Sequence, residues 1–347
     1  MRRCTRTRSV AMLGLCGFGA GCASTAPPGG PLPVRNQHPA QLTVLHMDPA
    51  PATVLPAGQV VVRENLAYSS LWLRGSIGTR RFEMDGEYLR AATRFQLGLG
   101  EGLEFGLELP VAHTSGGFLD AFIIDYHSWF GFPDQGRNEN ARGDFAIGAS
   151  QNGQGLWSVD ADGFAMLDVP LQLTWTVLEP TPQRLGLALR GALELPTGDA
   201  DRGYGSGGVD ASFGMLLQHR TGPLEWYGHA QHTFASTPNA TKRAGLTFAD
   251  VTSLGGAVEL PLGDTLAALV QVEWETSTLR SLDIPVVSRD QLLLWVGGRL
   301  RVADEWNVEI GFGEDLQGLV SPDFTAWLSV VWMPGAGAAR TPPPLPL

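Results

Sequence analysis

The stretch LGLALRGALEL, residues 185–195, decides the fold of this chain. Leucine stands at every second position except Gly191, and the residues between the leucines are small or charged. A period of two indicates an extended strand, because successive side chains then point to opposite faces. One face of this strand is therefore apolar, and the other face carries Arg190 and Glu194.

The residues that follow extend this pattern. The breaker cluster PTGDAD at 196–201 predicts a loop, and the alternation resumes from Val209 to Leu217. Two strands of roughly ten residues, each with one apolar face, have the length and pattern of tilted strands that cross a bilayer. A soluble sandwich shows the same alternation, usually in shorter strands.

The recurrence of the alternation along the chain favours the membrane alternative. It predicts about 12 strands, with short turns alternating with longer loops, which is the layout of an outer-membrane barrel. We therefore expect an all-β fold, a transmembrane antiparallel up-and-down β-barrel with both termini in the periplasm. The expected strands cover residues 58–69, 87–99, 103–109, 165–177, 185–195, 209–218, 224–234, 254–260, 266–275, 292–302, 306–312 and 324–332.

Tryptophans stand mostly near the ends of these expected strands, where an aromatic girdle would meet the membrane surfaces. A soluble sheet also accommodates tryptophan at strand ends, so this placement is supportive evidence only. The residues are Trp72, Trp157, Trp175, Trp226, Trp274, Trp306 and Trp332.

The regions outside the expected barrel have their own signatures. Residues 1–23 resemble an export signal, since four arginines precede a short apolar stretch, and a lipidated Cys22 is an equally open alternative. Residues 24–57 are rich in proline and predict an irregular periplasmic segment. This segment could also fold back into the barrel as a short plug, although its pattern does not require it. The barrel covers residues 58–333, and a Pro/Ala-rich tail covers 334–347.

Composition excludes several classes of protein. The 347-residue chain has a formal net charge of −11 and no basic stripe, which argues against a nucleic-acid partner. No internal stretch offers the ~20 apolar residues of a spanning helix. All three cysteines fall at or before Cys22. We therefore expect the mature chain to hold no disulfide and no thiolate metal site.

The segment 111–142 predicts a long outer loop that contains one short amphipathic helix. Phe118, Phe122, Tyr126 and Trp129 recur at helical spacing, and Asp120 lies off that stripe. Two positions for this helix are open: it folds into the barrel mouth and constricts it, or it packs on the rim without a gating role.

The polar faces of the expected strands carry charges of both signs. Such residues either pair across the interior and fill it or line a water-filled path for a small solute. An eight-stranded barrel fills itself, whereas ~16 strands leave a wide channel, so about 12 strands fit either outcome. The candidate lumen-lining residues are Arg90, Arg94, Glu104, Glu108, Arg190, Glu194, Glu273, Glu275, Arg299, Arg301 and Glu309.

Three functions follow from this reading. The first is a monomeric barrel in the lipid bilayer of the outer membrane that acts as a narrow channel for small solutes. The alternative is a closed structural or surface-interaction barrel that binds a partner through its outer loops. A barrel lipid hydrolase comes third, because His113, Ser115, Asp120 and His127 share one loop, yet no nucleophile elbow surrounds the serine. We expect no catalytic residue.

Metal and cofactor sites are not expected either. His229 and His232 differ in parity on one strand, so they face opposite sides. Asp199, Asp201 and Asp210 lie near a glycine-rich loop but lack the spacing of a calcium motif. Solvated loop carboxylates explain them better.

Several motifs resemble an uncharacterised family of bacterial outer-membrane barrels, the domain of unknown function 3187. They are PVRNQHP at 33–39, SGGFLD at 115–120 with GFP at 131–133, and LPTGD at 195–199 with GSGG at 205–208. The family usually enters its middle strand with Gly-Leu-Gly-Asp, of which FAMLD at 164–168 keeps only Asp168. The resemblance implies the barrel fold and the outer membrane, and it leaves the activity open.

Overall fold

The computed structural model describes residues 29–118, 125, 129, 143–160, 163–317, 321–322 and 324–335. The predicted export signal, with Cys22, lies outside the described residues, as does nearly all of the predicted C-terminal tail. None of the described helices is long and apolar enough to cross a membrane.

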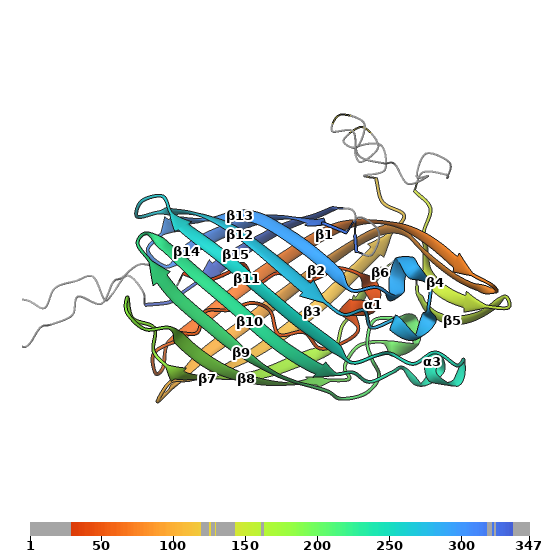
Figure 1. Ribbon diagram of the computed structural model, residues 1–347, viewed down its shortest axis with the longest axis horizontal. Helices are drawn as coiled ribbons and strands as arrows, with labels where there is room; N and C mark the ends of the chain where they lie inside the picture. Colours follow the sequence, from red (N-terminus) through yellow and green to blue (C-terminus); the bar gives the residue numbers. More distant parts are fainter. Residues whose placement is uncertain are drawn as a thin grey trace, which may run out of the picture.

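Twelve strands close into one antiparallel barrel, as the alternation predicted, because the first strand pairs with the last (Figure 1). Each barrel strand pairs with its neighbour in the chain, so the topology is up-and-down. The strands are β1 (Val60–Ile77), β2 (Arg80–Gly100), β3 (Leu103–Ser115), β7 (Val169–Leu178), β8 (Gly186–Leu195), β9 (Asp210–Thr221), β10 (Leu224–Phe234), β11 (Val251–Pro261), β12 (Leu266–Glu275), β13 (Gln291–Ala303), β14 (Trp306–Asp315) and β15 (Phe324–Trp332).

The two ends of the barrel differ. We call the end that carries the short connections, such as the one between β2 and β3, the turn end. We call the opposite end the loop end. The beginning of β1 and the end of β15 both lie at the turn end, since Val62 pairs with Trp332. The loop end holds α3 (Asn239–Arg243), α4 (Pro285–Ser288) and the 3-10 turns η2 (Ala200–Arg202) and η3 (Arg280–Leu282).

Strands β1 and β2 are longer than predicted and project beyond the barrel at the loop end. The predicted strands ended at residue 69 and began at residue 87, whereas the pairing continues to Ile77 and Arg80. The alternation of apolar residues fades there because both faces of the hairpin pack against protein. The outer half of β2 pairs with β4 (Ala146–Gln151), which forms a hairpin with β5 (Gln154–Val159). This hairpin turns at Asn152-Gly153, a dipeptide typical of tight hairpin turns, and both residues have positive φ.

The predicted strand at 165–177 is interrupted. Its first part belongs to β6 (Gly163–Met166), which pairs with the outer end of β3, and its second part is β7. The two parts differ in register by one residue, and Leu167 and Asp168 lie in the irregularity between them.

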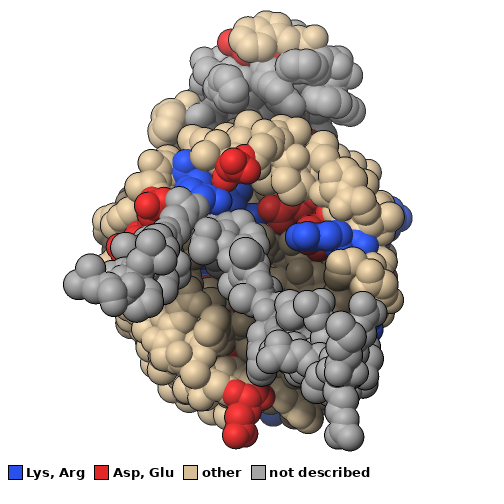
Figure 2. All heavy atoms as spheres, turned by 90° about the vertical axis from the view of Figure 1, so that its left-hand side faces the viewer, with Lys and Arg blue, Asp and Glu red and all other residues tan. Residues whose placement is uncertain are grey.

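The two faces of each barrel strand meet different surroundings. On β8, Leu189 and Leu193 are 44% and 50% exposed, whereas Arg190 and Glu194 are each 3% exposed. The exposed apolar side chains form a belt around the barrel. Seen from the turn end, acidic and basic residues stand among uncharged ones (Figure 2). Trp306 and Trp332 stack at the turn end with ring centroids 5.9 Å apart. Trp72 and Trp157, predicted for the same girdle, are instead buried at the loop end.

The leucine row of β8 provides a test of this lipid-facing belt. Leu189→Arg, in the middle of the row, should lower the free energy of unfolding in lipid vesicles by about 2–4 kcal/mol. Leu185→Arg, which precedes β8 at the turn end, should cost about 0–1 kcal/mol because the guanidinium reaches the interface. Urea unfolding in vesicles measures both values. Equal costs at the two positions would contradict a membrane-embedded belt.

Candidate functional site

Residues 29–56, which we call the plug, lie inside the barrel (Figure 1). Every residue from Gly30 to Pro49 is buried. Of the two placements that the sequence left open, the structure has the plug inside the barrel and not a segment outside it. The backbone is irregular, as predicted, apart from α1 (Pro39–Leu42). The prolines prevent the plug from joining the sheet, so wall side chains must satisfy its main chain.

The plug enters at the turn end through a network centred on Arg299. This guanidinium donates to Glu259 and Glu309 at 2.6 Å each, and to the carbonyl oxygen of Gly30 at 2.7 Å. The N–H of Gly30 donates to Glu259 at 2.9 Å. Arg63 forms a further salt bridge with Glu309. A single buried arginine thus joins the plug to two strands of the wall.

The rising part of the plug packs on apolar and then polar wall residues. Leu32 belongs to a buried cluster with Trp295 and Trp327. A Cβ at Gly297 would lie 2.8 Å from Leu32 and 2.2 Å from a wall carbonyl, so a glycine is required there. Further along, Asn36 donates to Glu275 at 2.7 Å.

At the loop end the plug turns back through α1. His38 caps this helix by accepting from the N–H of Ala40 at 3.2 Å, and its ring stacks on Phe82 with centroids 5.7 Å apart. Leu42 and Val44 enter the largest buried apolar cluster of the described residues. That cluster joins the β1–β2 projection, β4, β5 and the loops around α3 and α4, and it closes the loop end. We call it the cap.

The descending part of the plug is held through its main chain. The N–H of Leu45 donates to Asp210 at 3.1 Å, and the N–H of Met47 donates to Gln231 at 3.1 Å. Arg190 donates to the carbonyl oxygens of residues 47 and 48. Near the turn end, the N–H of Leu55 donates to Glu104 at 3.0 Å. Side chains of the wall therefore replace the ladder that the plug cannot form.

The predicted lumen-lining residues all lie on the inward face of the wall. Most are buried against the plug, and Arg94 and Arg301 are partly buried. Arg63, Asp210 and Glu259 also point inward but were not predicted, although the parity of their strands was the available signal. With these three, the inward residues named so far comprise eight carboxylates and six guanidinium groups.

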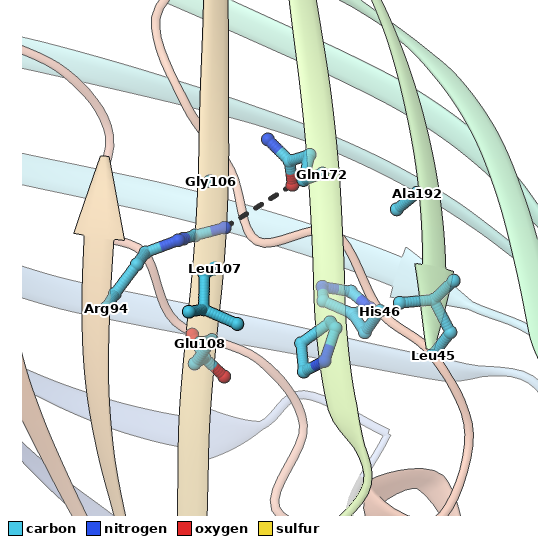
Figure 3. A pocket seen from close by; sticks show the side chains of 9 residues that line it. Leu45, His46, Arg94, Gly106, Leu107, Glu108, Gln172 and Ala192 are labelled. Atoms are coloured by element: carbon cyan, nitrogen blue, oxygen red, sulfur yellow. Dashed lines mark hydrogen bonds between the residues drawn. The ribbon is translucent and has the colours of Figure 1, made fainter. Parts of the chain in front are cut away.

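A small cavity lies beside the plug. It has a volume of about 10 Å³, lies between the plug and β2, β3, β7 and β8, and is lined by Arg94, His46, Gln172 and their neighbours (Figure 3). A volume of this size holds at most about one water molecule. At this place the plug therefore packs closely against the wall.

A second polar centre orders the loop between β8 and β9. Asp168 accepts from the N–H groups of Gly198 and Ser206 at 2.7 Å each. Burial raises the pKa of the Asp168 carboxyl, and the two N–H donors partly oppose that shift. The LPTGD and GSGG motifs therefore close around the aspartate at 168, the residue retained from the family's usual strand entry.

The structure tests little of the predicted loop helix. Phe118 and Trp129 are 76% and 72% exposed, whereas Asp120, Phe122 and Tyr126 lie outside the described residues. The helix and its position therefore stay predictions. Ser115 is the last residue of β3 and does not cap a helix.

The structure does not test the hydrolase hypothesis, because Asp120 and His127 lie outside the described residues. The metal chemistry considered from the sequence can be examined in the part that is described. No group of three or more potential ligands for a metal ion occurs among the described residues. His229 is buried and His232 is exposed, so they face opposite sides as predicted. Asp199 accepts from the N–H of Arg202, and Asp210 binds the plug.

Fold and lumen together define a closed 12-strand β-barrel of the outer-membrane type with an internal N-terminal plug. The family model "Protein of unknown function (DUF3187)" matches residues 20–332. The chain therefore belongs to this family, as its motifs suggested. No curated protein matches the chain.

Solved structures agree with the fold. The COG4313 outer membrane channel from Pseudomonas putida F1 is similar over 83% of this chain and 100% of its own, with 11% identity and a TM-score of 0.54. A Pseudomonas aeruginosa FadL homologue aligns over 88% of this chain and 99% of its own, with 10% identity and a TM-score of 0.40. These likenesses concern the fold alone.

The network around Arg299 predicts a large effect of one substitution. Arg299→Met leaves Glu259 and Glu309 buried with fewer partners and should cost about 3–5 kcal/mol of unfolding free energy. Arg220→Met breaks the pair with Glu225, in which the arginine side chain is 59% exposed, and should cost about 0–1 kcal/mol. Urea unfolding in vesicles measures both, and similar values would show that the plug entry is not held by this arginine.

The loop around Asp168 provides a local test. Asp168→Ala leaves two buried N–H groups without their acceptor, at a cost of about 1–3 kcal/mol. Trypsin should then cut after Arg202 faster than in the unaltered protein. Asp201→Ala, which removes an exposed carboxyl from the same loop, is the control and should leave the rate unchanged. Equal rates in both variants would refute the ordering role of Asp168.

Proposed function

We propose that this protein is a narrow outer-membrane channel for small polar solutes, gated by its plug. The observation that carries the proposal is the polar seam between plug and wall. Charged and amide side chains from β3, β8, β9, β11, β12 and β13 hold the plug through hydrogen bonds.

The energetics of this seam favour an exchangeable plug over a permanent filling. Buried ion pairs add little stability compared with an apolar core of the same volume, because their desolvation is costly. Several buried atoms at the seam, including Arg35 Nε, His46 Nε2 and Arg190 Nε, have no hydrogen-bond partner among the described residues. Water entering the seam would satisfy these groups, so displacement of the plug costs less than opening an apolar interior.

The cap is coupled to displacement of the plug. Ala40, Leu42 and Val44 of the plug are part of its apolar cluster. Withdrawal of α1 removes these side chains from the centre of the cap. Plug displacement and opening of the loop end are therefore one event in this proposal.

Two further features support the assignment. The COG4313 outer membrane channel from Pseudomonas putida F1 has a similar fold, with a TM-score of 0.54. Charged and amide side chains line much of the plug interface, beside apolar clusters around Leu32, Leu45 and Ala52. The polar part of this lining suits polar solutes. The turn end, where the barrel strands begin and end, would face the periplasm, as it does in barrels with this layout.

A closed barrel that acts through its outer loops is the second candidate. The cap favours it, because a folded apolar core at the loop end offers a rigid platform built from β4, β5 and the adjoining loops. In that case the plug is a permanent structural element and the lumen never conducts.

Conductance in planar bilayers distinguishes the two candidates. We expect small or intermittent currents from the unaltered protein and larger, steady currents after deletion of residues 29–56. A second variant, Leu45→Cys with Ala192→Cys in a Cys22→Ser background, locks the plug by oxidation, since both side chains lie in one cluster. Oxidation should abolish the currents and reduction should restore them.

Each cysteine variant alone is the matched control and should conduct in both redox states. Heat-modifiable migration in gels shows whether each variant is folded. If the folded barrel never conducts, neither after deletion of residues 29–56 nor as the reduced double-cysteine variant, the channel is overturned in favour of the closed barrel.

A further inference from the structure

The inward face of the wall carries an excess of carboxylates that its arginines do not neutralise. Four arginines are engaged by carboxylates: Arg299 by Glu259 and Glu309, Arg63 by Glu309, Arg90 by Glu108, and Arg94 by Asp48 of the plug. Each of these guanidinium groups thus offsets a negative charge within the lumen.

Two other buried arginines are used differently. Arg190 donates to the main-chain carbonyls of residues 47 and 48 of the plug. Arg35, within the plug, donates to the carbonyls of Gln41 and Val44 at 2.7 and 3.0 Å. Neither forms a salt bridge among the described residues.

Five lumen carboxylates consequently have no salt bridge to Lys or Arg within the described part of the chain. They are Glu104, Glu194, Asp210, Glu273 and Glu275. The imidazole of His46 lies near one of them, with its Nδ1 3.8 Å from Glu275. Without a direct salt bridge, the guanidinium of Arg35 acts electrostatically on the carboxylates at 194, 273 and 275, and that of Arg190 on those at 104 and 273.

Four of the five carboxylates stand in two like-charged pairs. Glu194 and Asp210 are directly opposite each other in the ladder between β8 and β9. Glu273 and Glu275 are two positions apart on β12, so both lie on its inward face. Glu104 lies near the turn end, beside Leu55 of the plug. The uncompensated charge therefore extends from the loop end to the turn end along the plug seam.

Two buried oxygens in this seam point to a missing donor or cation. Glu194 Oε2 and Gln271 Oε1 belong to side chains that are 3% and 1% exposed, and neither atom has a hydrogen-bond partner among the described residues. Gln271 also donates to Glu273 at 2.8 Å and to the plug carbonyl of Leu32 at 3.3 Å. An acceptor oxygen in such a place is satisfied by water or by a cation.

We propose that the passage along the plug seam selects small cations over anions, and that these five carboxylates set the selectivity. This inference rests on the proposed channel function and names the class of solute. Rows of Asp and Glu in a narrow pore raise the local cation concentration and exclude anions, because low-dielectric walls focus their field. The six guanidinium groups named on the inward face weaken this field without cancelling it, because eight carboxylates face them.

The reversal potential under a KCl gradient tests the proposal, at about 0.1 M salt so that screening stays moderate. We expect roughly a threefold preference for K⁺ over Cl⁻, in the unaltered protein and after deletion of residues 29–56. Glu273→Gln with Glu275→Gln should reduce the preference, and adding Glu194→Gln and Asp210→Asn should bring the ratio to about one.

The matched control is Glu101→Gln with Glu179→Gln, which removes two carboxylates from exposed turns at the turn end. It should retain the preference for K⁺. If the quadruple variant fails to fold, the double variant on β12 is decisive. Its ratio of K⁺ to Cl⁻ permeability should lie between that of the unaltered protein and one.

The outcomes separate this inference from the channel itself. Conductance with no preference, with a preference for Cl⁻, or with a preference that survives the β12 double substitution would overturn cation selectivity and leave the channel standing. Absence of conductance in every folded form, including the plug deletion, would overturn both.

Discussion

Every main-chain polar group within a bilayer needs a hydrogen-bond partner inside the protein, and the whole architecture depends on that constraint. The strands meet it by closure, since β1 pairs with β15 and no edge is left. The plug cannot meet it in the same way, because its prolines lack the N–H and exclude it from the sheet. Its amides and carbonyls are therefore bound by side chains of the wall.

This second solution explains why the lumen is polar. Asp210, Gln231 and Glu104 accept from plug N–H groups, while Arg190 and Arg299 donate to plug carbonyls. A wall of leucine on both faces would leave the plug backbone unsatisfied at a cost of several kcal/mol for each group. The charges inside the barrel thus have a structural role, since they bind the plug. The same charges set the electrostatic potential of any passage that runs along them.

The sequence predicted the barrel because its signal is local. A period of two, repeated through twelve segments, needs no knowledge of distant contacts, and the strands from Gly186–Leu195 to Phe324–Trp332 lie close to their predicted positions. The inward residues followed from the same parity. Arg63, Asp210 and Glu259 were not predicted to line the lumen, because each stands at the end of a strand or among residues that break the alternation.

The plug was not predictable in the same way. Its partners lie 165 residues away for Leu45 and 229 residues away for Gly30, and no period links them. A composition rich in proline is typical of a solvated linker. The unusual feature was the apolar content between the prolines, Leu32, Val34, Leu42, Val44, Leu45 and Met47, which a linker in water does not require.

Two of the three motif groups that carry the family resemblance lie at the loop end. PVRNQHP contains the turn of the plug and the cap of α1, while LPTGD and GSGG surround Asp168 on the same loop end. A lipid-facing position needs an apolar side chain of almost any shape. A buried turn of the plug instead needs particular donors and acceptors at fixed positions, such as Asn36 against Glu275. Sequence identity is therefore expected to persist where the plug turns, and the loop end of the lumen is the part of this barrel most constrained by its chemistry.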